Sequence, residues 1–93
     1  MKQFCFTVRD PNGIHARPAG ALSSFAKGFS CAVRIRNGEK EADAKRLLAV
    51  MALGARCGAT LTVTVCGEEE EKASLALQAF CEKQFGQADA SEG

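Results

Sequence analysis

The dipeptide Asn37-Gly38 restricts the fold of this chain more than any other feature, because it lies between two strand-like stretches. Asn-Gly in that position is a strong signal for a two-residue hairpin turn. Residues 31–36, before it, alternate between apolar and polar side chains, which is typical of a half-buried strand. The stretch from Glu39 to Ala42 is then expected to return as a short antiparallel strand. The fold must therefore contain an antiparallel sheet.

The same periodicities predict two further strands and three helices. Strand-like alternation recurs from Phe4 to Val8 and from Thr60 to Val65. Apolar residues at helical spacing occupy Ala16 to Lys27, a stretch that ends at Leu53 before Gly54, and a stretch from the acidic run Glu68–Glu71 to Gly86. The order β-α-β-β-α-β-α predicts an α+β open-faced sandwich, in which a four-stranded antiparallel sheet carries three helices on one face.

The length of 93 residues suits one domain with one core. We expect that domain to cover residues 1–86, with 87–93 as a polar, disordered tail. A net charge of +1 argues against nucleic-acid binding through overall charge, and the predicted central strands lack the aromatic residues on which RNA-recognition modules stack bases. The longest apolar stretch, Leu47–Ala55, is too short to span a bilayer, and no signal-peptide pattern follows Met1. We expect a cytoplasmic monomer that neither binds nucleic acid nor inserts into a membrane.

Five cysteines, at positions 5, 31, 57, 66 and 81, lack the spacing of a metal or disulfide site. No Cys-x-x-Cys pair exists, the number is odd, and only one histidine is present to complete a mixed zinc site. Free cysteines in apolar stretches behave as small hydrophobic residues. We therefore expect reduced, structural thiols, no metal and no cofactor.

The hexapeptide Gly13-Ile14-His15-Ala16-Arg17-Pro18 places the only histidine of the chain at the predicted start of a helix. The first turn of a helix has backbone N–H groups without intrahelical partners, which favour an anion. Pro18 fits this turn because its missing N–H is not needed there. The N–H groups of Ala16 and Arg17 and the Arg17 guanidinium are expected to converge on a phosphate on His15. The alternative is that His15 only caps the helix and Arg17 is a solvated charge.

The second predicted helix is apolar at nearly every position from Leu47 to Leu53, although a helix that lies on a sheet needs only one apolar stripe. Its outer face therefore has no core to contact. An exposed apolar patch beside the charges of Lys45 and Arg46 is typical of a protein interface. The alternative is a short helix that is buried on all sides.

Taken together, these blocks resemble the HPr family, the histidine-containing phosphocarriers of the bacterial phosphoenolpyruvate-dependent sugar phosphotransferase system. The resemblance covers nearly the whole chain, and the spacing between its blocks agrees. It rests on Phe4 to Val8, Gly13 to Ala19, Asn37-Gly38 followed by Lys40, Lys45, Val50 to Gly54, Gly58 and Gly67. The resemblance implies a phosphoryl carrier rather than a free-standing enzyme.

The resemblance also implies that phosphorylated Enzyme I passes its phosphoryl group to Nδ1 of His15, and that the enzyme IIA component of a sugar permease then takes it. Arg17 would stabilise the moving phosphoryl group. Both partners would dock in turn on a face formed by Gly20, Lys27, Leu47, Leu48 and Met51. A paralogue whose phosphoryl flux regulates metabolism is the alternative. An acid/base or metal enzyme is disfavoured, because no second histidine or paired carboxylate is evident near His15.

One position departs from the family pattern. Many members carry a serine where this chain has Arg46, and a regulatory kinase phosphorylates that serine to block transfer. Arg46 has no hydroxyl to accept phosphate and brings a positive charge instead, so we expect serine-based control at this position to be absent. Arg46 is also a poor N-cap, and Asp43 is expected to cap a slightly longer helix in its place.

Overall fold

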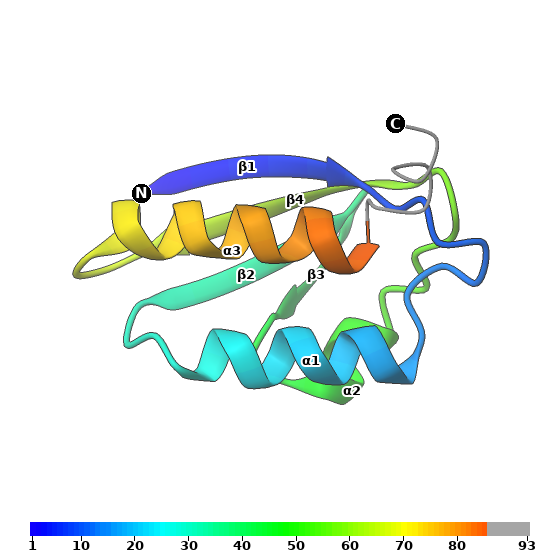
Figure 1. Cartoon of the computed structure of the whole chain (residues 1–93), viewed down its shortest axis with the longest axis horizontal. Coiled ribbons are helices and arrows are strands. Elements are labelled where there is room, and N and C mark those ends of the chain that lie inside the picture. Colours follow the sequence, from blue (N-terminus) through cyan, green and yellow to red (C-terminus); the bar gives the residue numbers. More distant parts are fainter. Residues whose placement is uncertain (86–93) are drawn as a thin grey trace.

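The computed structural model describes residues 1–85 and contains seven elements in the predicted order (Figure 1). The four strands are β1 (Lys2–Thr7), β2 (Ala32–Asn37), β3 (Lys40–Asp43) and β4 (Thr60–Cys66). The three helices are α1 (Ala16–Lys27), α2 (Leu47–Met51) and α3 (Glu70–Phe85). All three helices lie on the same side of the sheet, so the predicted open-faced α+β sandwich is confirmed. The predicted helix stop at Gly86 and the predicted tail at 87–93 lie outside the described residues.

The sheet has the strand order β1-β4-β2-β3, and every neighbouring pair is antiparallel. Phe4 of β1 lies opposite Val63 of β4, which lies opposite Ile35 of β2 on its other side, and all three side chains are buried. Adjacent positions along the strands, such as Cys5 and Arg36, are exposed. Because successive strand residues point to opposite faces, the alternation in the sequence places one apolar face under the helices and leaves the other face open.

The hairpin between β2 and β3 turns one residue later than predicted. Asn37 pairs with Lys40, so the turn residues are Gly38 and Glu39 rather than Asn37 and Gly38. Gly38 adopts a positive φ of +63°, whereas Asn37 does not adopt a positive φ. This matches a turn that needs glycine only at its first central position.

Two contacts explain this register. The Asn37 side chain donates through Nδ2 to the carbonyl oxygen of Leu53 at 3.0 Å, which keeps Asn37 in the strand. The register also places Ala42 opposite Ile35, and both side chains are buried. The predicted register would have placed Lys40 opposite Ile35, on the core side of the sheet.

Helices α1 and α3 cover the sheet and contact each other through aromatic rings. Phe25 of α1 stacks on Phe80 of α3 with ring centroids 4.3 Å apart, and Phe6 of β1 stacks on Phe85 of α3 at 5.5 Å. Such pairs add about 0.5–1.5 kcal/mol beyond the burial of their area. Among the helices of residues 1–85, none has both the length and the apolar character that crossing a membrane requires.

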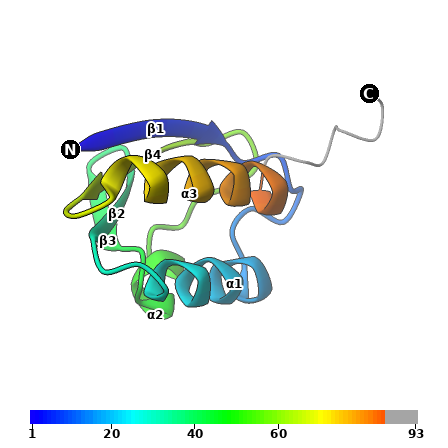
Figure 2. The ribbon, with the colours of Figure 1, turned by 60° about the vertical axis from the view of Figure 1, so that its left-hand side comes forward.

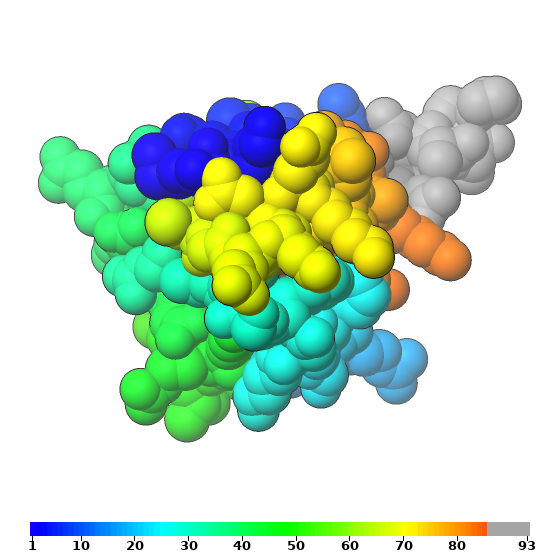
Figure 3. Space-filling model, turned by 90° about the vertical axis from the view of Figure 1, so that its left-hand side faces the viewer, coloured from blue at the N-terminus to red at the C-terminus, as the bar shows by residue number. Residues whose placement is uncertain are grey.

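The start of the chain is fixed at the end of the molecule that faces the viewer in Figure 3. The N-terminal amine of Met1 contacts the carboxylate of Glu70, the first residue of α3. The N–H of Gly67 also donates to this carboxylate, at 3.0 Å. The Met1 amine and the Gly67 N–H lower the pKa of Glu70. Helix α1 ends on this side, so its first turn lies at the opposite end of the molecule (Figure 1).

The second helix is shorter than predicted. Helix α2 begins after Arg46, its N-cap, which makes no side-chain capping bond, and it ends at Met51 instead of Leu53. The prediction that Asp43 caps a longer helix is wrong. Asp43 is the last residue of β3, and its Oδ1 accepts the N–H of Lys45 at 2.9 Å. Because this carboxylate closes a tight turn before the helix, it is not available to the first turn of α2.

The five cysteines differ in environment. Cys31 and Cys81 are buried, in agreement with a role as small core residues, whereas Cys5, Cys57 and Cys66 are exposed. Burial raises the pKa of the Cys81 thiol to about 12. In the part of the chain that the structure describes, no three His, Cys, Asp or Glu side chains come together as a metal site.

Candidate functional site

A tight turn leads the chain from β1 into α1. The carbonyl oxygen of Asp10 accepts the N–H of Gly13 at 2.8 Å, and Asp10 Oδ1 accepts the N–H of Asn12 at 2.9 Å. The Asp-Pro-Asn-Gly sequence is typical of such a turn, because Asp and Asn bond to the nearby backbone and Gly takes left-handed conformations. The turn therefore holds the Asp10 side chain in a defined position.

Gly13 fixes the path of the backbone immediately before His15. It has a φ of +69°, and a Cβ at this position would lie 2.5 Å from the carbonyl oxygen of Ala55. Ile14 donates its N–H to the same oxygen at 3.1 Å. Only glycine satisfies both the conformation and the close approach. The loop after α2 thus supports the approach to His15 (Figure 1).

His15 is the N-cap of α1, with extended backbone angles of φ −120° and ψ −177°. Its carbonyl oxygen accepts the N–H of Ala19 at 3.0 Å, which starts the helix. Its imidazole makes no capping hydrogen bond, and 42% of the side-chain surface is exposed. The alternative that the His15 side chain serves only to cap the helix is therefore wrong, because the side chain makes no capping bond.

The first turn of α1 presents unused hydrogen-bond donors beside His15. Ala16 and Arg17 are its first two residues, and their N–H groups have no hydrogen-bond partner within residues 1–85. Pro18 has no N–H to offer and is buried. The Arg17 side chain is exposed, and its guanidinium makes no hydrogen bond or ion pair with another described residue. These groups leave a positively polarised surface open to an anion.

The structure brings a carboxylate to His15 that sequence analysis did not find there. Asp10 Oδ2 lies 3.3 Å from His15 Nε2, and 29% of the Asp10 side chain is exposed. The Asn12 N–H, and to a lesser extent the hydrogen bond to His15, lower the pKa of Asp10. Asp10 is therefore an anion near neutral pH. The sequence feature that could have indicated this contact is the Asp-Pro-Asn-Gly turn, because a turn at this place brings residue 10 close to residue 15.

The outer face of α2 is exposed, as predicted. We call Leu47, Leu48 and Met51 the α2 patch; 37%, 78% and 36% of their surfaces are exposed. Val50 faces inward and is buried. The alternative of a helix buried on all sides is wrong.

Gly20 and Lys27 belong to the neighbouring helix α1, which lies beside α2 (Figure 2). A Cβ at Gly20 would meet no atom within 4 Å, so this position is open. Lys27 is exposed at the last residue of α1. The predicted docking residues therefore come from two adjacent helices.

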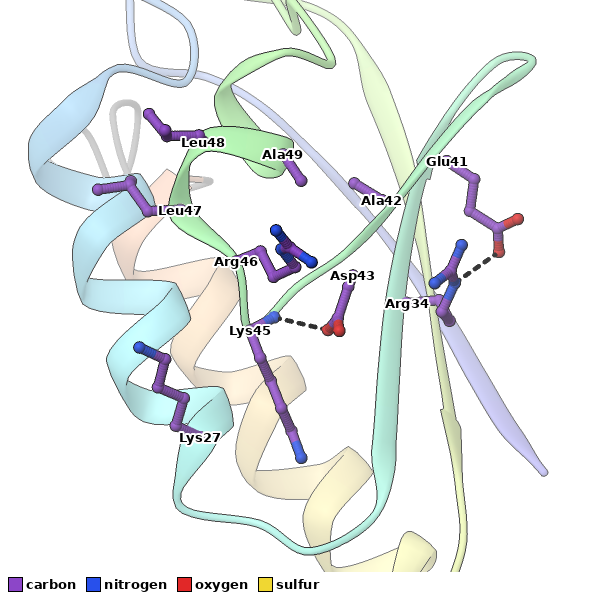
Figure 4. A pocket seen from close by; sticks show the side chains of 10 residues that line it. All are labelled: Lys27, Arg34, Glu41, Ala42, Asp43, Lys45, Arg46, Leu47, Leu48 and Ala49. Atoms are coloured by element: carbon purple, nitrogen blue, oxygen red, sulfur yellow. Dashed lines mark hydrogen bonds and ion pairs between the residues drawn. The ribbon is translucent and has the colours of Figure 1, made fainter.

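Arg46 lies beside a shallow hollow of about 740 Å³ that is rich in basic side chains (Figure 4). Lys27 reaches it from α1 and Arg34 from β2, where Arg34 Nε lies 3.5 Å from Glu41. Lys45 is not free at the rim, because its Nζ donates to the carbonyl oxygen of Phe29 at 2.7 Å. The residues that line the hollow are Lys27, Arg34, Glu41, Ala42, Asp43, Lys45, Arg46, Leu47, Leu48 and Ala49. Four basic side chains against two acidic ones leave this region positive.

Comparison with known protein families identifies the family to which this fold and site belong. Residues 2–83 match the family described as the PTS HPr component phosphorylation site. The chain belongs to the HPr family. The phosphocarrier protein HPr of Lysinibacillus sphaericus is 47% identical over 77 residues, which cover 83% of this chain and 88% of that protein. The predicted family is therefore confirmed, and the names of the family and of this relative support a phosphocarrier role in the phosphotransferase system.

Two further similarities show the range of the HPr family. The HPr-C-His structure from Thermoanaerobacter tengcongensis superposes with a TM-score of 0.84 at 31% identity, covering 92% of this chain and 97% of that one. The phosphoryl donor subunit DhaM of the PEP-dependent dihydroxyacetone kinase of Providencia stuartii is 33% identical over 81 residues. These residues make up 87% of this chain but 17% of DhaM, so the HPr-like part is a small portion of that protein.

Proposed function

We propose that this chain carries a phosphoryl group on Nδ1 of His15, accepting it from phosphorylated Enzyme I and passing it to an enzyme IIA. The observation that carries the proposal is the setting of the only histidine. His15 stands half-exposed at the N-cap of α1, its imidazole makes no capping bond, and Nε2 rather than Nδ1 faces Asp10. This leaves Nδ1 open to a partner.

The chemistry of transfer requires a nucleophile and charge stabilisation. A neutral imidazole nitrogen is a nucleophile that forms a covalent intermediate and later serves as a leaving group. Phosphoryl transfer develops charge on the equatorial oxygens, which positioned donors stabilise. The N–H groups of Ala16 and Arg17 and the guanidinium of Arg17, none of which has a partner among residues 1–85, support that role. The protein acts as a carrier, and its partners complete the catalytic site.

Both partners dock, in this proposal, on one surface near His15. The α2 patch, with Gly20 and Lys27 of α1, forms an exposed apolar area with a basic rim. Apolar patches of this kind mark protein interfaces. Since donor and acceptor would use the same area, the carrier would bind one at a time. We further propose that residues 1–86 form the carrier domain and that the protein acts as a cytoplasmic monomer without cofactor or metal.

The residue at position 46 determines whether the chain can be regulated by phosphorylation of a serine there. Arg46 offers no hydroxyl, and the surrounding hollow is positively charged. We propose that control by phosphorylation of a serine at this position is absent.

A second candidate is a relay that serves a reaction other than sugar transport. The similarity to the phosphoryl donor subunit of a PEP-dependent dihydroxyacetone kinase favours it. The two candidates share the step at His15 and differ in the acceptor. Offering the phosphorylated chain to a sugar-specific enzyme IIA and to a dihydroxyacetone kinase separates them, because each candidate predicts loss of the phosphoryl group to only one.

The proposal is tested by incubating the protein with phosphoenolpyruvate and catalytic amounts of Enzyme I. Phosphorus NMR is expected to show one phosphohistidine resonance, and omission of Enzyme I is expected to abolish it. The resonance should disappear when an enzyme IIA acceptor is added in excess. A protein that stays unphosphorylated with active Enzyme I is not a carrier of this system.

A further inference from the structure

We propose that Asp10 is a positioning residue, which holds the proton of neutral His15 on Nε2 and so keeps Nδ1 available as the phosphoryl acceptor. This inference rests on the proposed phosphocarrier function. It adds a residue that neither the hexapeptide around His15 nor the docking surface contains. The contact that motivates it joins Asp10 Oδ2 to His15 Nε2 at 3.3 Å.

The position of the Asp10 carboxylate is set by the backbone rather than by His15. Oδ1 accepts the N–H of Asn12 at 2.9 Å, and the Asp10 carbonyl oxygen accepts the N–H of Gly13 at 2.8 Å. One carboxylate oxygen is therefore committed to the turn. The other oxygen, Oδ2, is directed to the imidazole. A side chain fixed in this way can orient the ring, because it does not have to be ordered by the ring itself.

An ionised carboxylate selects one tautomer of a neutral imidazole. A carboxylate only accepts hydrogen bonds, so the nitrogen that faces it must carry the proton. The ring nitrogen that makes such a bond determines the state of the other one. With the proton on Nε2, the lone pair of His15 is on Nδ1. The Asn12 N–H helps to keep Asp10 ionised, since it lowers the pKa of that carboxyl group.

The same contact serves both directions of transfer. When the Nδ1 lone pair forms a bond to phosphorus, the bond between phosphorus and Enzyme I breaks, and its electron pair stays on Enzyme I. The proton remains on Nε2, so the phosphorylated ring is a cation that faces the Asp10 anion. When the phosphoryl group leaves for the acceptor, the pair of the P–N bond returns to Nδ1 and the ring is neutral again. No proton has to move at either step.

The placement of charge suits this role. Asp10 acts on the nitrogen distal to the phosphoryl group, and Arg17 and the first turn of α1 provide the donors for the phosphoryl oxygens. The negative charge of Asp10 therefore lies on the side of the ring away from the incoming phosphoryl group. Hydrogen bonds to charged groups contribute more than neutral ones, so loss of Asp10 is expected to slow transfer about ten- to a hundredfold.

The variant Asp10→Asn separates this role from the turn. The asparagine side-chain oxygen can still accept the N–H of Asn12, so the turn is retained. In place of Oδ2 it presents an NH₂ group, which only donates and therefore favours the proton on Nδ1. Asp10→Ala removes both contacts. Glu39→Gln is the matched control, because it removes an exposed carboxylate at the hairpin turn that forms no hydrogen bond or ion pair with His15 within residues 1–85.

The first measurement is nitrogen NMR of protein labelled at the histidine ring, at about pH 8.5, where imidazole side chains are neutral. Wild type and Glu39→Gln are expected to carry the proton on Nε2, whereas Asp10→Asn is expected to shift population to the Nδ1–H form. Identical tautomer populations in wild type and Asp10→Asn would overturn the inference. This measurement needs no partner, so it does not depend on the proposed function.

The second measurement is single-turnover transfer from phosphorylated Enzyme I. Asp10→Asn is expected to lower the transfer rate ten- to a hundredfold with an unchanged KM for Enzyme I, because Asp10 is not on the docking face. An unchanged rate, or a loss confined to KM, contradicts the inference. If wild type accepts no phosphoryl group at all while the tautomer shift occurs, the proposed function fails and the positioning of the ring by Asp10 stands.

Discussion

The carbonyl oxygen of Ala55 occupies the space where a side chain at Gly13 would begin, 2.5 Å from the Cβ position. The same oxygen accepts the N–H of Ile14 at 3.1 Å. One oxygen of the loop after α2 thus determines both the conformation and the identity of the residue two places before His15. The site depends on a contact between segments that are more than 40 positions apart in the sequence.

Gly13→Ala is therefore expected to destabilise the protein and to displace His15. A positive φ costs a residue with a Cβ about 1–2 kcal/mol. The overlap with Ala55 adds a further cost of about 1–3 kcal/mol, which is typical of overpacking. Gly38→Ala is the matched control, because Gly38 has a φ of +63° but no atom within 4 Å of its Cβ position. Equal losses of unfolding free energy in denaturant titrations of the two variants would contradict the importance of the Ala55 contact.

Leu48→Asp is expected to impair docking to Enzyme I and to leave the fold intact. Leu48 is 78% exposed, so a charge at this position costs little in the free protein but must be desolvated in a complex. The readout is a KM for Enzyme I that rises at least tenfold with an unchanged unfolding midpoint. Leu75→Asp, at an exposed position of α3 outside the α2 patch, should leave both values unchanged. Unfolding of the Leu48 variant would place this side chain in the core.

Arg46→Ser is expected to have two effects: it stabilises α2, and it introduces a hydroxyl that can accept phosphate. Arg46 is the N-cap without a side-chain bond, and a serine cap contributes about 1 kcal/mol relative to a residue that cannot cap. Arg46→Ala, which neither caps nor accepts phosphate, is the control. Wild type should take no phosphate from ATP and a serine kinase of the system. Ser23 of the wild-type protein is buried, and its hydroxyl donates to the carbonyl oxygen of Ala44 at 3.0 Å, so this serine is not accessible to the kinase.

If the serine kinase modifies the Arg46→Ser variant and transfer from Enzyme I then falls, the surface is a regulatory site that lacks only the hydroxyl. Modification of the wild-type protein at another serine, with loss of carrier activity, would show that control has moved rather than disappeared.

Stability is expected to fall at alkaline pH through Cys81. Burial raises the pKa of this thiol from 9.0 to about 12, so between these values the unfolded chain has lost a proton that the folded protein still holds. The folded state binds more protons there, and the free energy of unfolding decreases by up to about 1.4 kcal/mol per pH unit. Cys81→Ala lacks this proton and should show a shallower decline from pH 9 upward. Parallel declines in wild type and variant would exclude Cys81 as the cause.

Much of the fold follows from local patterns in the sequence. The alternation around Val63 and Ile35 and the apolar spacing in α1 and α3 are each set by one buried face, so periodicity alone predicts them. The exposed α2 patch was predictable for a similar reason, because Leu47, Leu48 and Met51 exceed what one buried stripe can hold.

The errors arose where a specific side-chain contact, which hydrophobic periodicity does not encode, decides the local structure. The hairpin register depends on Asn37 binding the carbonyl oxygen of Leu53, which no pattern near Asn37 contains. Asp43 looked like a helix cap but closes a turn with Lys45. Asp10 lies outside the hexapeptide around His15, and its contact with the imidazole forms only when the turn between β1 and α1 brings the two side chains together.

The most direct test of the carrier proposal is the stoichiometry of acid-labile phosphate on wild type and on His15→Ala after incubation with phosphoenolpyruvate and Enzyme I. Because His15 is the only histidine, we predict one phosphate per wild-type chain and none on the variant. The variant should stay folded with an unfolding midpoint close to that of wild type, since the imidazole makes no capping bond and its contact with Asp10 is partly exposed to solvent. Acid-labile phosphate on the folded His15→Ala protein would contradict the central claim.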